Sequence, residues 1–132
     1  MYEWRGNFLS PEVEALHAEG FNHEPRSDFD WSAQLGTYSL GWVCARSGAA
    51  LVGFVNVAWD GQTHAFLLDT VVARTNQRQG IGARLVAIAA REAMAAGCEW
   101  LHADFEDHLS QFYFESCGFR PSSAGLIRLK GL

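Results

Sequence analysis

The sequence predicts a single α/β domain whose elements follow the order β-α-α-β-β-β-α-β-α-β. Three observations predict it. Three strand-like runs follow one another at hairpin spacing in the middle of the chain. The last of these runs passes through a short glycine turn into a long alanine-rich helical pattern. A further strand, helix and strand then complete the order without any internal repeat. At 132 residues the chain has the length of one domain, residues 1–132.

The beginning of the chain predicts a strand and a helix. Tyr2 to Asn7 alternates aromatic and polar residues, as a strand with one buried face does. Ser10 followed by Pro11 is typical of a helix start, with Ser10 as N-cap and Pro11 in the first turn. Gly20 is a natural stop, so the first helix is expected from about Pro11 to Glu19.

The middle of the chain predicts a short helix and then three strands joined by hairpin turns. Asp60-Gly61 between two β-rich runs is a strong hairpin signal. The third strand is apolar on both faces except at Asp69 and Thr70, which predicts a central strand covered on both sides. The expected elements are a helix from Trp31 to Leu35 that ends near Gly36, and strands at Ser39 to Ala45, Ala50 to Trp59 and His64 to Ala73.

The last part of the chain alternates between helix and strand. Residues Gly80 to Ala96 have the clearest helical spacing in the sequence, and Gly97 ends the pattern. The remaining expected elements are a strand at Cys98 to Ala103, a helix at His108 to Cys117 and a strand at Ala124 to Leu129.

The turn before the long helix has the chemistry of an anion site. It runs Gln77-Arg78-Gln79-Gly80-Ile81-Gly82-Ala83-Arg84. The first turn of a helix has N–H groups without helical partners, and the helix dipole favours negative charge there, so a phosphate binds well. Glycine at positions 80 and 82 removes the Cβ atoms that would keep a diphosphate away from the amides. Arg78, Arg84 and Arg74 are candidates for positive charge at the rim. The alternative is a tight turn that binds nothing.

Two other phosphate motifs do not fit this turn. The dinucleotide fingerprint needs a third glycine where this chain has Leu85, and a P-loop needs a Gly-Lys-Ser/Thr sequence that does not follow.

The form Gln77-x-x-Gly80-x-Gly82 after Val71-Val72 resembles the acyl-coenzyme A pyrophosphate loop of the GNAT acyltransferase superfamily, Gln/Arg-x-x-Gly-x-Gly/Ala. The element order and the closing Cys117-Gly118-Phe119 also resemble that superfamily. The resemblance implies a three-layer fold with a mixed sheet, in which the strands Ala65–Ala73 and Cys98–Ala103 splay apart. Acetyl-coenzyme A would enter the gap, backbone near Val71 and Val72 would pair with its pantetheine, and amides from Gln77 to Ala83 would hold its diphosphate.

Acyl transfer to an amine requires a base for the amine, a donor to the thioester carbonyl and a proton for the departing thiolate. A backbone N–H near Val72 is the candidate donor. Asp69 is the first candidate base, because it is the only acid in an otherwise apolar strand and the family often places an acid there. The alternative is that Asp69 only accepts hydrogen bonds in the core. Asp104 and His102 are the next candidates.

The sequence departs from the family pattern at the general acid. The family usually has tyrosine four residues before the glycine of Gly-Phe, and here that position is Phe114. Tyr113 stands one residue earlier, about 100° away around an α-helix. Three alternatives remain: a helical bulge brings Tyr113 to the sulfur, water protonates the thiolate, or transfer is slow or absent. Tyr113 is the candidate acid, and a core tyrosine is the competing interpretation.

Other chemistries have weaker support. A Cys117 nucleophile would need a nearby histidine, and His108 lies too far back on the same helix. His102, Asp104 and His108 lack a clear further ligand, so no metal is expected. The sequence contains no stripe of basic residues, so nucleic-acid binding is not expected. No apolar stretch has the length of a membrane span, so no membrane insertion is expected.

Composition indicates an ordinary globular protein, 48% hydrophobic with net charge −5. Its three cysteines form no paired motif, and no signal peptide follows Met1, so a cytoplasmic location is expected. Residues 1–70 hold nine acids against three arginines, which favours a cationic co-substrate.

The sequence therefore predicts a GNAT-type N-acetyltransferase that uses acetyl-coenzyme A and a primary amine on a small molecule or peptide. The alternatives are an acyl-coenzyme A-binding sensor or partner module with little catalysis, and a scaffold without ligand. A homodimer is reasonable from the resemblance.

Overall fold

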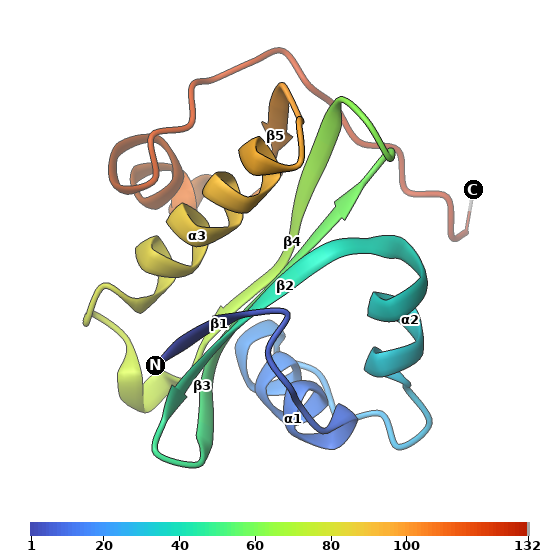
Figure 1. Ribbon diagram of the computed structural model, residues 1–132, viewed down its shortest axis with the longest axis vertical. Helices are drawn as coiled ribbons and strands as arrows, with labels where there is room; N and C mark the ends of the chain where they lie inside the picture. The colour runs from blue at the N-terminus through green and yellow to red at the C-terminus, as the bar shows by residue number, and fades with distance from the viewer. Residues whose placement is uncertain (132) are drawn as a thin grey trace.

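The computed structural model describes residues 1–131 and contains a five-stranded mixed sheet with helices on both faces (Figure 1). The first four strands pair antiparallel in the order β1-β2-β3-β4, and β5 pairs parallel with β4. The three-layer α/β prediction is therefore confirmed. The strands are β1 (Tyr2–Trp4), β2 (Ser39–Ser47), β3 (Ala50–Trp59), β4 (His64–Val72) and β5 (Trp100–His102).

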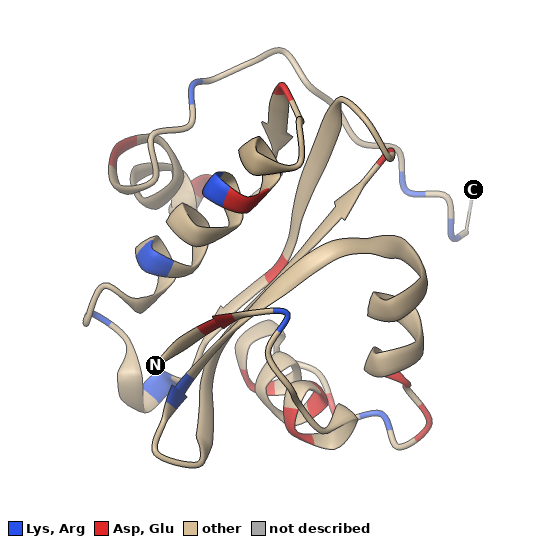
Figure 2. Ribbon diagram, viewed as in Figure 1, with Lys and Arg blue, Asp and Glu red and all other residues tan. Residues whose placement is uncertain are grey.

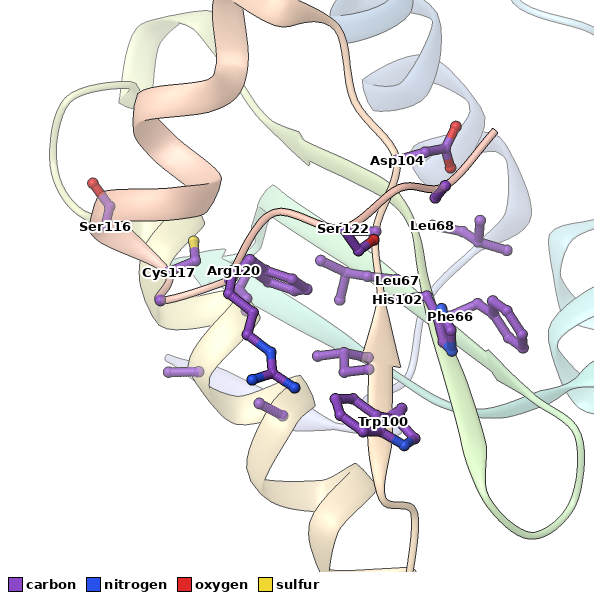
Figure 3. A pocket seen from close by; sticks show the side chains of 18 of the residues that line it. Phe66, Leu67, Leu68, Trp100, His102, Asp104, Ser116, Cys117, Arg120 and Ser122 are labelled. Carbon is purple, nitrogen blue, oxygen red and sulfur yellow. The ribbon is translucent and has the colours of Figure 1, made fainter. Parts of the chain in front are cut away.

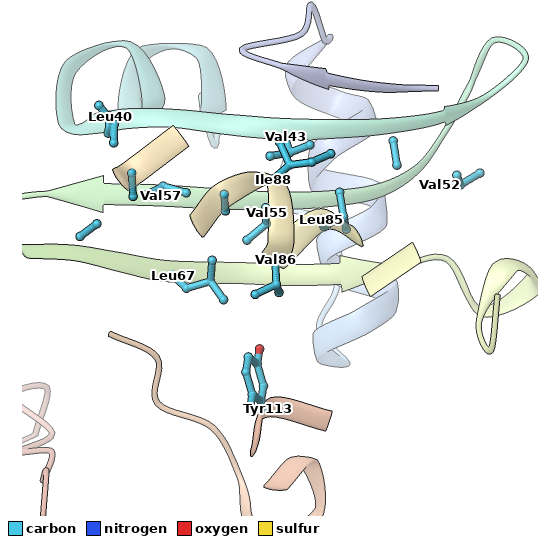
Figure 4. Packing of buried hydrophobic residues seen from close by; sticks show 14 residues of the cluster. Leu40, Val43, Val52, Val55, Val57, Leu67, Leu85, Val86, Ile88 and Tyr113 are labelled. Atoms are coloured by element: carbon cyan, nitrogen blue, oxygen red, sulfur yellow. The ribbon is translucent and has the colours of Figure 1, made fainter. Parts of the chain in front are cut away.

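The helices divide between the two faces of the sheet. One face carries α1 (Ser10–Phe21) and α2 (Trp31–Tyr38), and the other carries α3 (Ile81–Ala95) with the π-helical turn η3 (Gln111–Ser116) (Figure 1). Two short 3-10 turns, η1 (Arg74–Asn76) and η2 (Asp107–Leu109), lie in the connections. Separate apolar clusters fill the two interfaces, and the larger one, under α3, includes Tyr113 of η3 (Figure 4).

The central strand of the sheet is β3 rather than β4. Successive residues of β3 alternate between the two clusters, with Val55 and Val57 under α3 and Phe54 under α1 and α2. In β4, Phe66 and Leu68 are exposed, so the prediction that both faces of this strand are covered is wrong there. The cluster beneath α1 reaches β4 only at Val71, which leaves the first half of the strand open on that face.

The β4 strand carries a bulge at Asp69. Phe54 pairs with Val71 and Asn56 with Leu68, so β4 has one more residue than β3 between these two pairs. Asp69 has φ +59°, a left-handed conformation that a β-bulge can impose on one residue. The bulge changes the alternation of side chains and turns Val71 toward α1.

The N-terminal helix begins one residue earlier than expected, and Ser10 is not its N-cap. Leu9 is the N-cap, and its N–H donates to Glu12 Oε2 at 2.8 Å. The Ser10 hydroxyl instead joins two segments, since it accepts from the Trp31 N–H at 2.8 Å and donates to the Phe29 carbonyl. The helix passes Gly20 and ends at Phe21, and its C-cap Asn22 takes a left-handed conformation.

The C-terminal prediction of a strand at 124–129 is wrong for the described chain. This segment has no strand assignment, and Leu126, Ile127 and Leu129 are exposed. A strand-like sequence forms no strand without a partner for its backbone, and β5 pairs only with β4. Within residues 1–131, no helix is long and apolar enough to cross a membrane.

Glu14 holds α1 to the loop that follows it. Its buried carboxylate accepts from Arg26 Nε and Nη2, both at 2.9 Å, from the Arg26 N–H and from Trp31 Nε1. The Arg26 guanidinium in particular lowers the pKa of Glu14 to about 2, against the opposing effect of burial.

Glu14→Gln is expected to lower the free energy of unfolding at pH 7 by about 2 to 3 kcal/mol. Because the folded-state pKa is lowered, this stabilisation is complete above the ordinary value of 4.5 and is lost as pH falls toward about 2. Urea unfolding of both proteins from pH 7 to pH 2.5 measures the difference, with the exposed Glu24→Gln as control. A difference that stays constant down to pH 2.5 would contradict this account.

Candidate active site

The gap between β4 and β5 opens a cavity beside the glycine loop. Pairing between the two strands ends at Phe66 with His102, and beyond this point no strand within residues 1–131 pairs with that edge of β4. The cavity there has a volume of about 410 Å³ and lies between the end of β4, the loop and η3. The predicted residues that line it are Val71, Val72, Gln77, Arg78, Gly80, Ile81, Gly82, Ala83 and Tyr113.

The loop leaves the first amides of α3 available. Gly80 is the N-cap with φ +78°, and the first helical bond runs from the Arg84 N–H to the Gly80 carbonyl at 3.1 Å. No side chain of the described residues caps this end, and its first turn has no acid. The N–H groups of Ile81, Gly82 and Ala83 therefore point out of the helix without a capping side chain, as an anion site requires.

The two glycines have different roles, contrary to the common role expected from the sequence. A Cβ added to Gly80 would meet no atom within 4 Å, so glycine there serves the left-handed backbone and keeps the surface open. A Cβ on Gly82 would lie 3.1 Å from Phe112 Cζ and 3.7 Å from Val72 Cγ2. Gly82 thus permits η3 to pack closely against the start of α3.

The polar residues in and around the loop also differ in what they contact. Gln77 Nε2 donates to the Val72 carbonyl at 3.3 Å and ties the loop to the end of β4. Arg78 lines the cavity. Arg84 lies over the Tyr2 ring, 5.5 Å from its centroid, and Arg74 hydrogen-bonds to Glu19 of α1. Neither Arg84 nor Gln79 lines the cavity, so Arg78 is the cavity arginine among the predicted residues.

Tyr113 reaches the cavity because η3 is π-helical. The Cys117 N–H donates to the carbonyl of Phe112, five residues earlier, at 2.9 Å. A π turn holds one more residue than an α turn, so Tyr113, five residues before Gly118, takes the place expected for a residue four before it. Its hydroxyl points toward β4 (Figure 4), while Phe114 packs edge-on against Phe105. The structure therefore contains a helical bulge before Gly118, which was one of the three alternatives that the sequence left open for the general acid.

The hydroxyl of Tyr113 is protonated at neutral pH. Its side chain is buried, and burial raises the pKa of the phenol above its ordinary value of 10.0, while a contact with Thr70 lowers it in part. The phenol therefore keeps its proton in the physiological pH range.

Asp69 lies on the other face of the sheet and does not line the cavity. Its Oδ1 is 3.0 Å from His17 Nε2 of α1, and its Oδ2 accepts from Asn56 Nδ2 at 3.4 Å. Neither His17 nor Asn56 was expected at this site from the sequence. The His17 partner lies 52 residues away, and no spacing rule connects an isolated histidine on a helix to a bulge on a distant strand.

The remaining candidates lie around a second cavity of about 800 Å³, between β4, β5, α3 and the C-terminal segment (Figure 3). His102 stacks on Phe66 and contacts His64 at 2.8 Å. Burial raises the pKa of Cys117 to about 11, so this thiol is not a ready nucleophile. Within residues 1–131, no three His, Cys, Asp or Glu side chains are placed so that together they could hold a metal ion.

Comparisons with known proteins identify the family and the fold. The profile of the acetyltransferase (GNAT) family matches residues 2–119. A search of curated proteins gave no match. Among solved structures, a putative acetyltransferase from Agrobacterium tumefaciens is similar with a TM-score of 0.80 and 19% identity over 96% of this chain and 99% of that one.

Two further structures show the same fold. Glucosamine-6-phosphate N-acetyltransferase from Arabidopsis thaliana has a TM-score of 0.75 and 12% identity, with 97% of each chain covered. AAC(6')-Iy, solved with the bisubstrate analog CoA-S-monomethyl-acetylneamine, has a TM-score of 0.69 and 18% identity, again with 97% of each chain covered. Since the family profile spans nearly the whole sequence, the chain belongs to the acetyltransferase (GNAT) family.

Proposed function

We propose that this protein is an N-acetyltransferase that transfers acetyl from acetyl-coenzyme A to a primary amine by direct attack. The observation that carries the proposal is the single cavity shared by the open amides of α3, the free edge of β4 and the Tyr113 hydroxyl. The family uses acetyl-coenzyme A, and a similar structure was solved with a coenzyme A analog. The loop amides and Arg78 suit its diphosphate, and the unpaired edge at Val71 and Val72 suits its pantetheine amides.

The proposed reaction needs no covalent enzyme intermediate. The amine nitrogen attacks the thioester carbonyl carbon, a C–N bond forms and the C–S bond breaks. The proton lost by the amine leaves toward Asp69, and Tyr113 gives its proton to the sulfur of coenzyme A. Tyr113 contacts Thr70 on one face of the sheet, and Asp69, the preceding residue of β4, contacts His17 on the other face, so the proposed acid and base would act from different sides of this strand.

The acceptor is proposed to be a cationic amine. Figure 2 shows that acidic residues outnumber basic ones on α1 and the loop that follows it, whereas basic residues outnumber acidic ones on α3 and the loop before it. Such a distribution places positive potential beside the diphosphate site and negative potential on the side of Asp69. The exposed Phe66 and Leu68 on that same face offer apolar contact to the rest of the acceptor.

The test combines calorimetry of acetyl-coenzyme A with turnover on a panel of alkylamines, polyamines, amino acids, aminoglycosides and peptides, with products identified by mass spectrometry. We expect binding and turnover with at least one cationic amine, and a loss of kcat of about 100-fold in Asp69→Asn. Binding without turnover on any acceptor would instead favour the sensor or partner module. No binding would contradict both functions.

A further inference from the structure

A chain of three titratable side chains leads from β4 to the surface on the α1 side. Asp69 Oδ1 lies 3.0 Å from His17 Nε2, and His17 Nδ1 lies 2.7 Å from His23 Nε2. His23 Nδ1 lies 2.8 Å from the carbonyl oxygen of Glu24. The members come from a strand, a helix and a loop, and all four nitrogens of the two imidazoles have partners. We propose that Asp69, His17 and His23 form a proton relay that takes up the proton released by the acceptor amine; this inference rests on the proposed acyl transfer.

The number of protons that the relay holds follows from the groups at its two ends, Asp69 and the Glu24 carbonyl. The Glu24 carbonyl only accepts, so His23 Nδ1 must carry a hydrogen to bond with it. Three contacts link Asp69, the two imidazoles and this carbonyl, and each contact needs one proton. The fully bonded chain therefore holds three protons and no net charge, whether the mobile proton sits on Asp69 or on an imidazole.

The same count defines the form that accepts a proton. When Asp69 is ionised and both imidazoles are neutral, the chain holds two protons, and one of its three contacts lacks a hydrogen. A proton from the amine restores the missing hydrogen bond when it enters at Asp69. Successive transfers along the chain bring a proton to His23, and its loss to solvent regenerates the accepting form. Each step moves one proton between atoms already 2.7 to 3.0 Å apart.

Burial along the chain suits a relay. The His17 side chain is only 13% exposed, whereas Asp69 is 23% and His23 29% exposed. His17 is packed between the Phe21 ring, stacked at 4.3 Å, and the Trp31 ring at 5.2 Å. The middle of the relay is thus shielded, and both of its ends are more exposed to solvent.

A buried carboxylate lies beside the outer end of the relay. Glu14 Oε2 of α1 lies 3.9 Å from His23 Nδ1, and its own charge is partly balanced by Arg26. On the inner end, Asn56 of β3 donates to Asp69 and carries no charge. The negative charge of Glu14 therefore faces His23, the member from which the proposed relay releases its proton.

The test compares His17→Gln and His23→Gln with the parent on an acceptor that the parent acetylates. We expect each variant to lose about tenfold in kcat at pH 7, while KM for acetyl-coenzyme A stays within about twofold. The pH dependence of kcat should change in both variants. Imidazole added to a His23→Ala variant should restore part of the activity. The matched control is His64→Gln, which breaks the other histidine pair, His64 with His102 at 2.8 Å.

A second readout does not depend on turnover. Nitrogen-15 spectra of the imidazoles should show a strongly hydrogen-bonded proton shared by His17 and His23, absent in either variant and kept in His64→Gln. Parent turnover with unchanged kcat and pH dependence in both variants would overturn the relay and leave the proposed function intact. Parent protein without turnover on any acceptor would contradict both. Lack of the shared proton would overturn the relay by itself.

Discussion

Gly80→Glu is expected to weaken acetyl-coenzyme A binding by about 100-fold or more, a loss of about 3 kcal/mol. Glycine at this position leaves open space above the first amides of α3, in which an added Cβ meets no atom within 4 Å. A glutamate side chain would fill that space and place a negative charge where the diphosphate is proposed to bind. Calorimetry with acetyl-coenzyme A measures the change directly.

The chain offers a matched control for this substitution. Gly48, in the turn between β2 and β3, also has a left-handed backbone, with φ +60° against +78° at Gly80, and an added Cβ there likewise meets nothing within 4 Å. Gly48→Glu therefore carries a comparable backbone strain of about 1 to 2 kcal/mol and the same charge. It should bind acetyl-coenzyme A as the parent does. Equal binding by all three proteins would show that the loop is not the diphosphate site.

A substitution at Gly82 would be a poorer test. An added Cβ there approaches the Phe112 ring at 3.1 Å, so that η3 would have to move. Lost binding could then reflect a displaced Tyr113 rather than a filled anion site. The sequence pattern treats both glycines alike, and only the packing of η3 separates a conformational role from a packing role.

The parts of the fold that the sequence predicted well are those controlled by local chemistry. The strand Ala50–Trp59 is found with the predicted bounds, because alternating apolar residues and the Asp60-Gly61 turn fix it locally. The helix after the glycine loop is found within one residue at each end for the same reason. The glycine loop and the end of β4, which line the cavity, lie directly before α3 in the sequence. Their positions could therefore be predicted together with that helix.

The features that the sequence predicted wrongly or did not predict depend on contacts between segments far apart in the sequence. The segment 124–129 has an apolar pattern that fits a strand, but a strand also requires a partner, and sequence alone does not supply one. The contact of Asp69 with His17 depends on a bulge that turns one residue of β4 to the α1 face. Ser10 has the right residue type for an N-cap, yet its hydroxyl is used between α1 and α2.

The position of Tyr113 shows how a helix can accommodate one additional residue by forming a π turn. Compared with the family spacing, this chain has one residue more between Tyr113 and Gly118. In a regular α-helix that residue would turn Tyr113 away from the cavity by about 100°. The π turn, with its bond from the Cys117 N–H to the Phe112 carbonyl, absorbs the residue and keeps Tyr113 buried beside Thr70.

Tyr113→Phe is therefore expected to lower kcat by about 100-fold or more, with little change in KM for acetyl-coenzyme A. The substitution removes only the hydroxyl, whose pKa is raised by burial and which therefore carries a proton to deliver at neutral pH. Steady-state kinetics on an accepted amine measures the effect, and circular dichroism checks the fold.

Phe114→Tyr in the Tyr113→Phe background is the informative control, because it moves the phenol to the position that the family spacing favours. Phe114 packs edge-on against Phe105, away from the cavity, so a hydroxyl there should not restore kcat. Restored activity in this double variant would mean that η3 rewinds to an α-helix when substrate binds. Unchanged kcat in Tyr113→Phe alone would mean that solvent, rather than Tyr113, protonates the departing thiolate.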